Sequence, residues 1–242
     1  MNYKLLLGRS FARVDTALQR SNLDFIKSKY PWGRNFVFDL KRLFGNNVEM
    51  IVDAGANVGS IAQEFSFYFP QAKILAFEPV LATFKRLEKK ALASGRIIPI
   101  QLALGESSYQ IEIPLNTEDT INSISAPPEQ QNICGYEMIN VESLDEYARK
   151  NRIEKVDILK IDVEGYEFKV LEGANHFIQS SIKAIVLEVG YERSSSKVHF
   201  SDVETYMENH GFQCCGIYDL SKSRDKRRLY YSNNLYIRKS LL

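Results

Sequence analysis

The sequence predicts an α/β fold built on an open, mainly parallel sheet. Short apolar runs, typical of buried strands, alternate with longer segments whose apolar residues recur at helical spacing. Because parallel strands need a crossover connection, usually a helix, this alternation favours parallel pairing. The last two apolar runs, 212–219 and 230–238, have no helix between them. We therefore expect them to form an antiparallel hairpin at one edge of the sheet.

Two helical segments precede the alternating pattern. Residues 3–29 are amphipathic, and residues 35–44 end at Gly45, a residue that favours helix ends. We expect them to form an N-terminal helical extension, residues 1–45, packed against a main domain of residues 46–242. A lid over the cleft or a homodimer surface is the alternative role for this extension.

The main domain supplies seven strands for the sheet and helices for both of its faces. Strands are expected at 48–53, 73–77, 96–101, 156–161, 182–189, 212–219 and 230–238, and helices at 59–69, 80–93, 143–150, 166–179 and 201–210. Ser143 is expected to cap its helix. A further short strand is expected at 110–115. The polar stretch 116–135, which contains Pro127-Pro128, is expected to be a loop or lid.

Composition excludes several classes of protein. Hydrophobic residues make up 45% of the 242, which is enough for a sizeable core. The net charge of +1 gives no reason to expect nucleic acid or an anionic membrane as a partner. No stretch approaches the roughly 18 apolar residues of a membrane span, and we expect no signal peptide. Cys134, Cys214 and Cys215 lack metal-ligand spacing, which favours a reducing compartment, and we expect a cytoplasmic protein.

Acidic residues lie at the ends of four expected strands. They are Asp53, Glu78, Asp162 with Glu164, and Glu188. The carboxyl ends of parallel strands meet at one edge of the sheet, where open α/β folds bind ligands. A glycine-rich turn, residues 54–59, follows the first of these acids but lacks the full G-x-G-x-x-G pattern. A carboxylate there repels phosphate and attracts a cation or hydroxyl, so a nucleoside with a positive sulfonium fits better than a dinucleotide.

Five segments, in chain order, resemble the FkbM-family methyltransferases. They are Val52–Gly59, Phe77–Pro79, Leu159–Glu167, Leu171–Ala174 and Ile185–Glu188. The resemblance covers about residues 48–192, and 234–238 are similar to the family's closing strand. It implies a Rossmann-like methyltransferase fold, S-adenosylmethionine as the methyl donor, and O-methylation of a hydroxyl, often on a sugar or polyketide product.

The resemblance also implies which residues hold the donor. The methionine side is expected to contact the first strand end and its turn, through Asp53, Gly55, Asn57 and Gly59. Glu78 is expected to bond the ribose hydroxyls. Strand 96–101 ends without an acid for the adenine amine, so Gln101 or backbone groups are expected to serve there.

Asp162 and Glu164 are implied to lie beside the transferred methyl group. Asp162 is our candidate for the base that takes the hydroxyl proton, and partial burial there is expected to raise its pKa. Lys160 shares its strand face, so this lysine could instead pair with Asp162 or orient the substrate. Glu188 and His199 are expected to approach the substrate, with His199 as a second base.

A metal-assisted reaction is the alternative chemistry for these carboxylates. Asp162, Glu164 and Glu188 are hard oxygen ligands that could hold Mg²⁺ against vicinal hydroxyls. We favour a site without metal, because no compact carboxylate motif such as an EF-hand loop is present.

The favoured function is S-adenosylmethionine-dependent O-methylation of a carbohydrate or other small hydroxylated metabolite. A nicotinamide-dependent oxidoreductase is one alternative, which the incomplete glycine fingerprint disfavours. A catalytically degenerate domain that binds or scaffolds a partner is the other. Loops 116–135, 190–200 and 222–228 are expected to recognise the acceptor.

Overall fold

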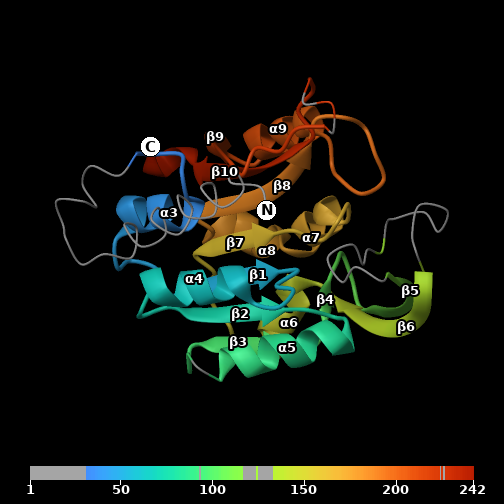
Figure 1. Cartoon of the computed structure of the whole chain (residues 1–242). Coiled ribbons are helices and arrows are strands. Elements are labelled where there is room, and N and C mark those ends of the chain that lie inside the picture. The colour runs from blue at the N-terminus through green and yellow to red at the C-terminus, as the bar shows by residue number, and fades with distance from the viewer. Residues whose placement is uncertain (1–30, 93, 117–123, 125–132, 224, 226) are drawn as a thin grey trace, which may run out of the picture.

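The computed structural model describes residues 31–242, apart from 93, 117–123, 125–132, 224 and 226. Within these residues the main sheet has seven strands in the order β3-β2-β1-β7-β8-β10-β9 (Figure 1). Neighbours from β3 to β8 are parallel, whereas β10 is antiparallel to both β8 and β9. The expected parallel sheet with an antiparallel pair at its edge is therefore confirmed. The predicted helix at 3–29 lies outside the described residues.

All seven predicted strands of the main sheet are present, with ends shifted by a few residues at most. They are β1 (Met50–Ala54), β2 (Lys73–Phe77), β3 (Ile97–Ile100), β7 (Ile158–Ile161), β8 (Ala184–Gly190), β9 (Phe212–Tyr218) and β10 (Tyr231–Arg238). Every residue of β7 and β8 is buried. Burial on both faces is why these two central strands are continuous apolar runs.

The described helices follow the expected order. They are α3 (Phe36–Phe44), α4 (Ser60–Tyr68), α5 (Leu81–Ala91), α6 (Leu144–Asn151), α7 (Glu167–Gly173), α8 (Asn175–Ser180), α9 (Phe200–Asn209) and a closing 3₁₀ turn, η3 (Lys239–Leu241). Ser143 caps α6 as predicted, accepting a hydrogen bond from Glu146 N at 3.2 Å. None of the helices in the described ranges is long and apolar enough to span a membrane.

Helices cover both faces of the sheet, and each face has its own apolar core (Figure 1). Side chains alternate along β1, so Ile51 belongs to one core and Val52 to the other. The first core lies under α3, α4 and α5 and includes Leu87. The second lies under α6 to α9 and includes Met207.

Helix α3 packs against the main domain. Asn35 caps it by accepting a hydrogen bond from Phe38 N at 2.8 Å, and its apolar side is buried in the first core. Its buried Asp39 accepts hydrogen bonds from Gly33 N at 2.7 Å and from the Tyr218 hydroxyl at 3.0 Å. These contacts tie α3 to β9, while the domain boundary at residue 45 stays a prediction.

A second, three-stranded sheet was only partly predicted. It has the order β4-β6-β5, from β4 (Ala103–Leu104), β5 (Tyr109–Asn116) and β6 (Ile133–Glu142). The loop predicted for 116–135 is therefore wrong at both ends, where Asn116 and residues 133–135 are strand. The signal for β6 is a period-two alternation that ends with buried Ile139 and Val141.

The single helix predicted at 166–179 is two helices, α7 and α8, which meet at Ala174. The last residue of α7, Gly173, lies so close to the second sheet's connection that an added Cβ would be 1.9 Å from the Gly105 carbonyl oxygen. This backbone contact holds the end of α7 against the segment that leads from β4 to β5.

Candidate active site

A glycine turn, hydrogen-bonded to the end of β2, follows β1 at the carboxyl edge of the sheet. The Gly55 and Ala56 N–H groups donate to the Phe77 carbonyl at 3.1 and 2.9 Å, which fastens the turn to the end of β2. Gly55 has φ +75°, and a Cβ there would lie 1.9 Å from the Asp162 carbonyl oxygen. Only glycine tolerates both the positive φ and the lack of space for a Cβ, so residue 55 must be glycine because the loop after β7 lies against it. Gly59, with φ +81°, opens α4 beneath Leu87.

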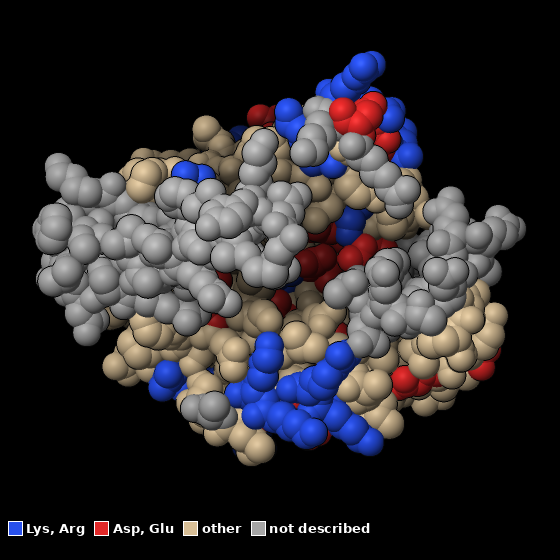
Figure 2. All heavy atoms as spheres, in the orientation of Figure 1, with Lys and Arg blue, Asp and Glu red and all other residues tan. Residues whose placement is uncertain are grey.

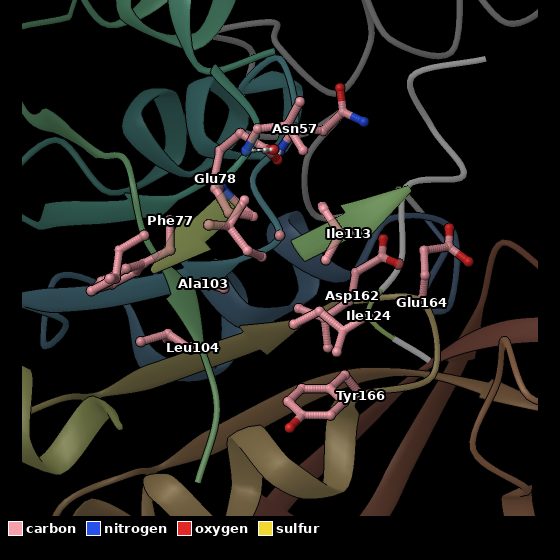
Figure 3. A pocket seen from close by; sticks show the side chains of 16 residues that line it. Asn57, Phe77, Glu78, Ala103, Leu104, Ile113, Ile124, Asp162, Glu164 and Tyr166 are labelled. Atoms are coloured by element: carbon pink, nitrogen blue, oxygen red, sulfur yellow. Dashed lines mark hydrogen bonds between the residues drawn. The ribbon is translucent and has the colours of Figure 1, made fainter. Parts of the chain in front are cut away.

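Glu78 is held beside this turn by two backbone donors. Its carboxylate accepts from Asn57 N at 3.1 Å, drawn as a dashed line in Figure 3, and from Val80 N at 3.0 Å. Burial raises the pKa of Glu78 to about 7, against the opposing effect of these two hydrogen bonds. A carboxylate offers about four lone-pair sites, so two donors leave it able to accept further hydrogen bonds from a ligand.

One cavity joins the turn, Glu78 and the loop after β7 (Figure 3). Its far wall is apolar and includes Leu102 and Leu104, together with Ile113 and Ile139 from the second sheet. Gln101, which was predicted to contact an adenine, has an exposed side chain that donates to the Pro79 carbonyl at 3.5 Å. The residues that follow it line the cavity, so the alternative of backbone contacts at this strand end is the one that suits the geometry.

Asp53 and Lys160 lie opposite each other on β1 and β7, and Lys160 also pairs with Asp162. Lys160 Nζ donates to Asp162 Oδ2 at 2.8 Å. Burial raises the pKa of Asp53 to about 6 against the attraction of Lys160, and its carboxylate oxygens have no hydrogen-bond partner among the described residues. Asp53, Lys160 and Asp162 also line a second cavity at the turn, together with Asn57.

The ion pair corrects one expectation for Asp162. Burial alone would raise the pKa of this carboxyl, as we predicted, but the adjacent Lys160 ammonium and the nearby Lys197 together hold the pKa below its usual range. Asp162 therefore stays ionised at neutral pH. The alternative prediction, that Lys160 pairs with Asp162, is the one that the geometry supports.

The other two predicted acids share a second buried lysine. Lys197, from the loop between β8 and α9, pairs with both Glu164 and Glu188. Burial raises the pKa of Glu188 to about 7, reinforced by the charge of Asp162 and opposed by Lys197. One oxygen each from Asp162, Glu164 and Glu188 lies within 4.8 Å of the others. Figure 2 shows the resulting hollow, with acidic side chains at its centre.

His199 lies at the start of α9 and caps it. Its Nδ1 accepts from Ser201 N at 3.3 Å and is 2.8 Å from the Ser201 hydroxyl oxygen. One imidazole nitrogen is thus engaged by its own helix, and its role toward a substrate stays a prediction.

Sequence reasoning missed three contributors to this region. Lys197 was not singled out in its serine-rich loop, and the apolar wall from β5 and β6 depends on a sheet of which only the strand at 110–115 was predicted. Tyr166 also lines the cavity, and its hydroxyl donates to Glu106 at 3.0 Å and contacts the Tyr109 hydroxyl. The alternation in β6 could have revealed the wall, whereas no local pattern distinguishes Lys197.

The cavity suits the donor that the sequence predicts. A glycine at residue 55 leaves space where a side chain would collide, Glu78 keeps acceptor capacity for hydroxyls, and the apolar wall can cover a flat base. The ionised Asp162 and the unpartnered Asp53 suit a ligand that carries positive charge.

Comparison with known proteins agrees with this geometry. The family model for the methyltransferase FkbM domain matches residues 53–214. Methyltransferase sdnD of Sordaria araneosa is 28% identical in an alignment 205 residues long, which covers 72% of this chain and 77% of that protein. The hexuronic acid methyltransferase AglP of Haloferax volcanii is 31% identical over 145 residues. That match covers 58% of this chain and only 56% of AglP.

A solved structure agrees at the level of the fold. The crystal structure of a methyltransferase FkbM from Methylobacillus flagellatus matches with a TM-score of 0.52 and 18% identity, covering 79% of this chain and 44% of that one. The matched residues 53–214 contain every acid of the site. The chain therefore belongs to the FkbM family of S-adenosylmethionine-dependent methyltransferases.

Proposed function

We propose that this methyltransferase acts on a hydroxyl of a carbohydrate or another small hydroxylated metabolite. The observation that carries the proposal is the single cavity in which Glu78 and the glycine turn lie at one side and Asp162 and Glu164 at the other. A nucleoside donor and a hydroxylated acceptor need these two kinds of wall side by side. The relative AglP is named a hexuronic acid methyltransferase, which supports a carbohydrate acceptor.

On the donor side, the turn and the ends of β1 and β2 hold S-adenosylmethionine. When bound, the donor supplies a methyl group on a positively charged sulfonium. Glu78 accepts hydrogen bonds from hydroxyl groups of the donor while its orientation is fixed by the backbone. Asp53, Gly55, Asn57 and Gly59 shape the turn, and the residues after Gln101 contact the base.

On the acceptor side, Asp162 accepts the hydrogen bond of the attacking hydroxyl and then its proton. The Lys160 ammonium keeps Asp162 ionised and fixes its direction, since Lys160 itself is buried. An ionised carboxylate with a low pKa is a weak base, so most of its effect is to position the hydroxyl in line with the methyl group. Glu164 and Glu188 accept hydrogen bonds from neighbouring hydroxyls.

The test is a mass-spectrometric screen of the donor with a panel of glycans and small polyols, scored by a gain of one methyl group. Asp162→Asn is expected to lower turnover by about 100-fold, because the hydroxyl loses both the acceptor that positions it and its base, while calorimetry finds unchanged binding of S-adenosylhomocysteine. Near-normal turnover in Asp162→Asn and Asp162→Ala would rule out the base role. Failure to bind S-adenosylhomocysteine would instead favour a degenerate binding domain, and binding of NADH an oxidoreductase.

A cytoplasmic location is part of the proposal. The three cysteines are all free, as suits a reducing compartment. For the oligomeric state, the proposal is a homodimer.

A further inference from the structure

Lys197 is a buried cation that the predicted mechanism does not use. It is 8% exposed, although it comes from a loop whose neighbours Glu192 to Ser195 are exposed. Its ammonium pairs with Glu164 and Glu188 and lies 5.6 Å from the centre of the Tyr231 ring. A lysine is seldom buried to this extent unless it is paired, so the pairing is the reason for its position.

The backbone places Lys197 closely. Gly190 N donates to the Val198 carbonyl at 2.8 Å, and a Cβ at Gly190 would lie 2.8 Å from Cβ of Lys197. On the other side, a Cβ at Gly165 would lie 2.3 Å from the Ser195 carbonyl oxygen. Two glycines thus allow the loop after β7 and the loop after β8 to interlock, and Lys197 lies at the junction.

Glu164 is held in an uncommon conformation that turns it toward this lysine. Its φ is +54°, and Gly165 follows with φ +98°. Non-glycine residues in the left-handed region are uncommon and tend to occur at functional sites. This left-handed conformation of Glu164 directs its carboxylate to the Lys197 ammonium.

The charges explain what the lysine does. Oxygens of Asp162, Glu164 and Glu188 lie within 4.8 Å of one another, and three carboxylates that close cannot all stay ionised without a cation. In many enzymes such a cluster holds Mg²⁺. Here Lys160 pairs with the first acid and Lys197 with the other two.

We propose that Lys197 is the resident cation of the acceptor site, where it takes the place of a divalent metal ion and holds Glu164 and Glu188 beside Asp162. The role of Lys197 in positioning the acceptor rests on the proposed function. The proposal that Lys197 occupies the place of a metal ion does not depend on it. The two carboxylates then stay oriented toward hydroxyl groups of the acceptor.

Manganese binding tests the proposal without donor or acceptor. Mn²⁺ is titrated into the full chain, and the free ion is followed by electron paramagnetic resonance. Lys197→Met keeps the length of the side chain and removes its charge, so it is expected to bind Mn²⁺ at least about tenfold more tightly than the wild type. Adding Glu188→Gln is expected to abolish that gain. Lys169→Met, which breaks an exposed pair with Glu172, is the control and should gain nothing.

Two outcomes overturn the proposal. One is a stoichiometric Mn²⁺ site in the wild type that Glu188→Gln removes, and the other is a folded Lys197→Met that gains no affinity. If Lys197→Met does not fold, the wild-type titration and Lys197→Arg, which keeps the charge and is expected to exclude Mn²⁺, still decide the question. Because these titrations need no methyl transfer, their result is separate from any failure to find an acceptor.

Turnover gives the second readout once an acceptor is known. Wild-type methyl transfer is expected to be unchanged by EDTA, and Lys197→Met to lower kcat by about tenfold or more, with Lys197→Arg retaining more of it. Activity that EDTA removes and Mg²⁺ restores in the wild type would contradict the proposal.

Discussion

Glu167 offers a sharp test of the electrostatics around the active-site loop. It is the first residue of α7 and is fully buried, and its Oε1 accepts hydrogen bonds from Gly165 N at 3.0 Å and Val163 N at 3.4 Å. The other oxygen, Oε2, is buried without a hydrogen-bond partner among the described residues. Burial raises the pKa of Glu167 from 4.5 to about 7, against the opposing hydrogen bonds.

The sign of the pH effect follows from proton linkage. Between the pKa of the unfolded chain and that of the folded protein, the folded state binds the extra proton. The free energy of unfolding therefore falls as the pH rises through this interval, and a pKa change from 4.5 to about 7 corresponds to a loss of about 3 kcal/mol. The contribution of Glu167 is fully present below pH 4.5 and fully lost above about pH 7.

Glu167→Gln removes this titration while keeping an oxygen for Gly165 N. Any destabilisation caused by the new amide itself is the same at every pH. We therefore compare how the difference in free energy of unfolding between variant and wild type changes with pH. That difference in free energy of unfolding is expected to shift in favour of Glu167→Gln by about 2 to 3 kcal/mol from about pH 5 to about pH 8. Urea titration at both pH values measures it.

The control is Glu154→Gln, which neutralises an exposed carboxylate. Its difference from the wild type is expected to stay within about 0.5 kcal/mol at both pH values. If the Glu167→Gln difference is equally flat, Glu167 does not carry a raised pKa and the account of its burial is wrong.

Three further predictions concern the ligands. Gly55→Ala forces a Cβ within 1.9 Å of the Asp162 carbonyl oxygen at φ +75°, so thermal unfolding should show a free energy of unfolding lower by more than about 2 kcal/mol. Calorimetry should show that this variant no longer binds S-adenosylhomocysteine. Gly95→Ala is the control, because Gly95 has φ +63° and nothing within 4 Å, and it should keep binding. Burial raises the pKa of Glu78 to about 7 and hydroxyl donors prefer the ionised carboxylate, so S-adenosylhomocysteine should bind more tightly as the pH rises through this value and level off above it. Glu78→Gln should weaken binding by about tenfold or more at high pH and remove that dependence, and a Glu78→Gln variant with the wild-type pH profile would refute the assignment. Above about pH 7, where Glu188 is ionised, three acids and two paired lysines leave the acceptor wall with one excess negative charge. Neutral glycosides should therefore be methylated faster than matching uronic acids at that pH, and the reverse order would refute this charge balance.

The main sheet could be predicted because its signals are local. The runs at Ile158–Ile161 and Ala184–Gly190 are apolar throughout, as expected of strands buried on both faces. The second sheet was harder to predict, because the outward positions of β6 include Tyr136 and Met138, which are exposed and apolar and so obscure its period-two alternation. The end of α7 at Gly173 contacts Gly105, which lies far away in the sequence, so local patterns do not reveal this contact.

The acids of the site were predictable for a topological reason. Parallel strands bring their carboxyl ends to one edge, so Asp53, Asp162 and Glu188 could be expected at the same edge once the strands were assigned. The strand order β1-β7-β8, which the sequence did not reveal, makes them neighbours. Their charge states were not predictable, since the pKa of Asp162 falls where burial alone would raise it. Lys160, two residues earlier on the same strand, makes the largest of the contributions that lower this pKa.

A fold that gathers carboxylates at one edge must also bring cations there, because buried like charges destabilise the folded chain. The sequence offers two ways to do so. Lys160 lies within the strand itself, where strand periodicity places it beside Asp162. Lys197 comes from a connection, 33 residues after Glu164, and only the crossing of two loops delivers it. Once strand-end acids are assigned in a chain of this fold, the loops after neighbouring strands are therefore the places to search for the lysine or arginine that neutralises them.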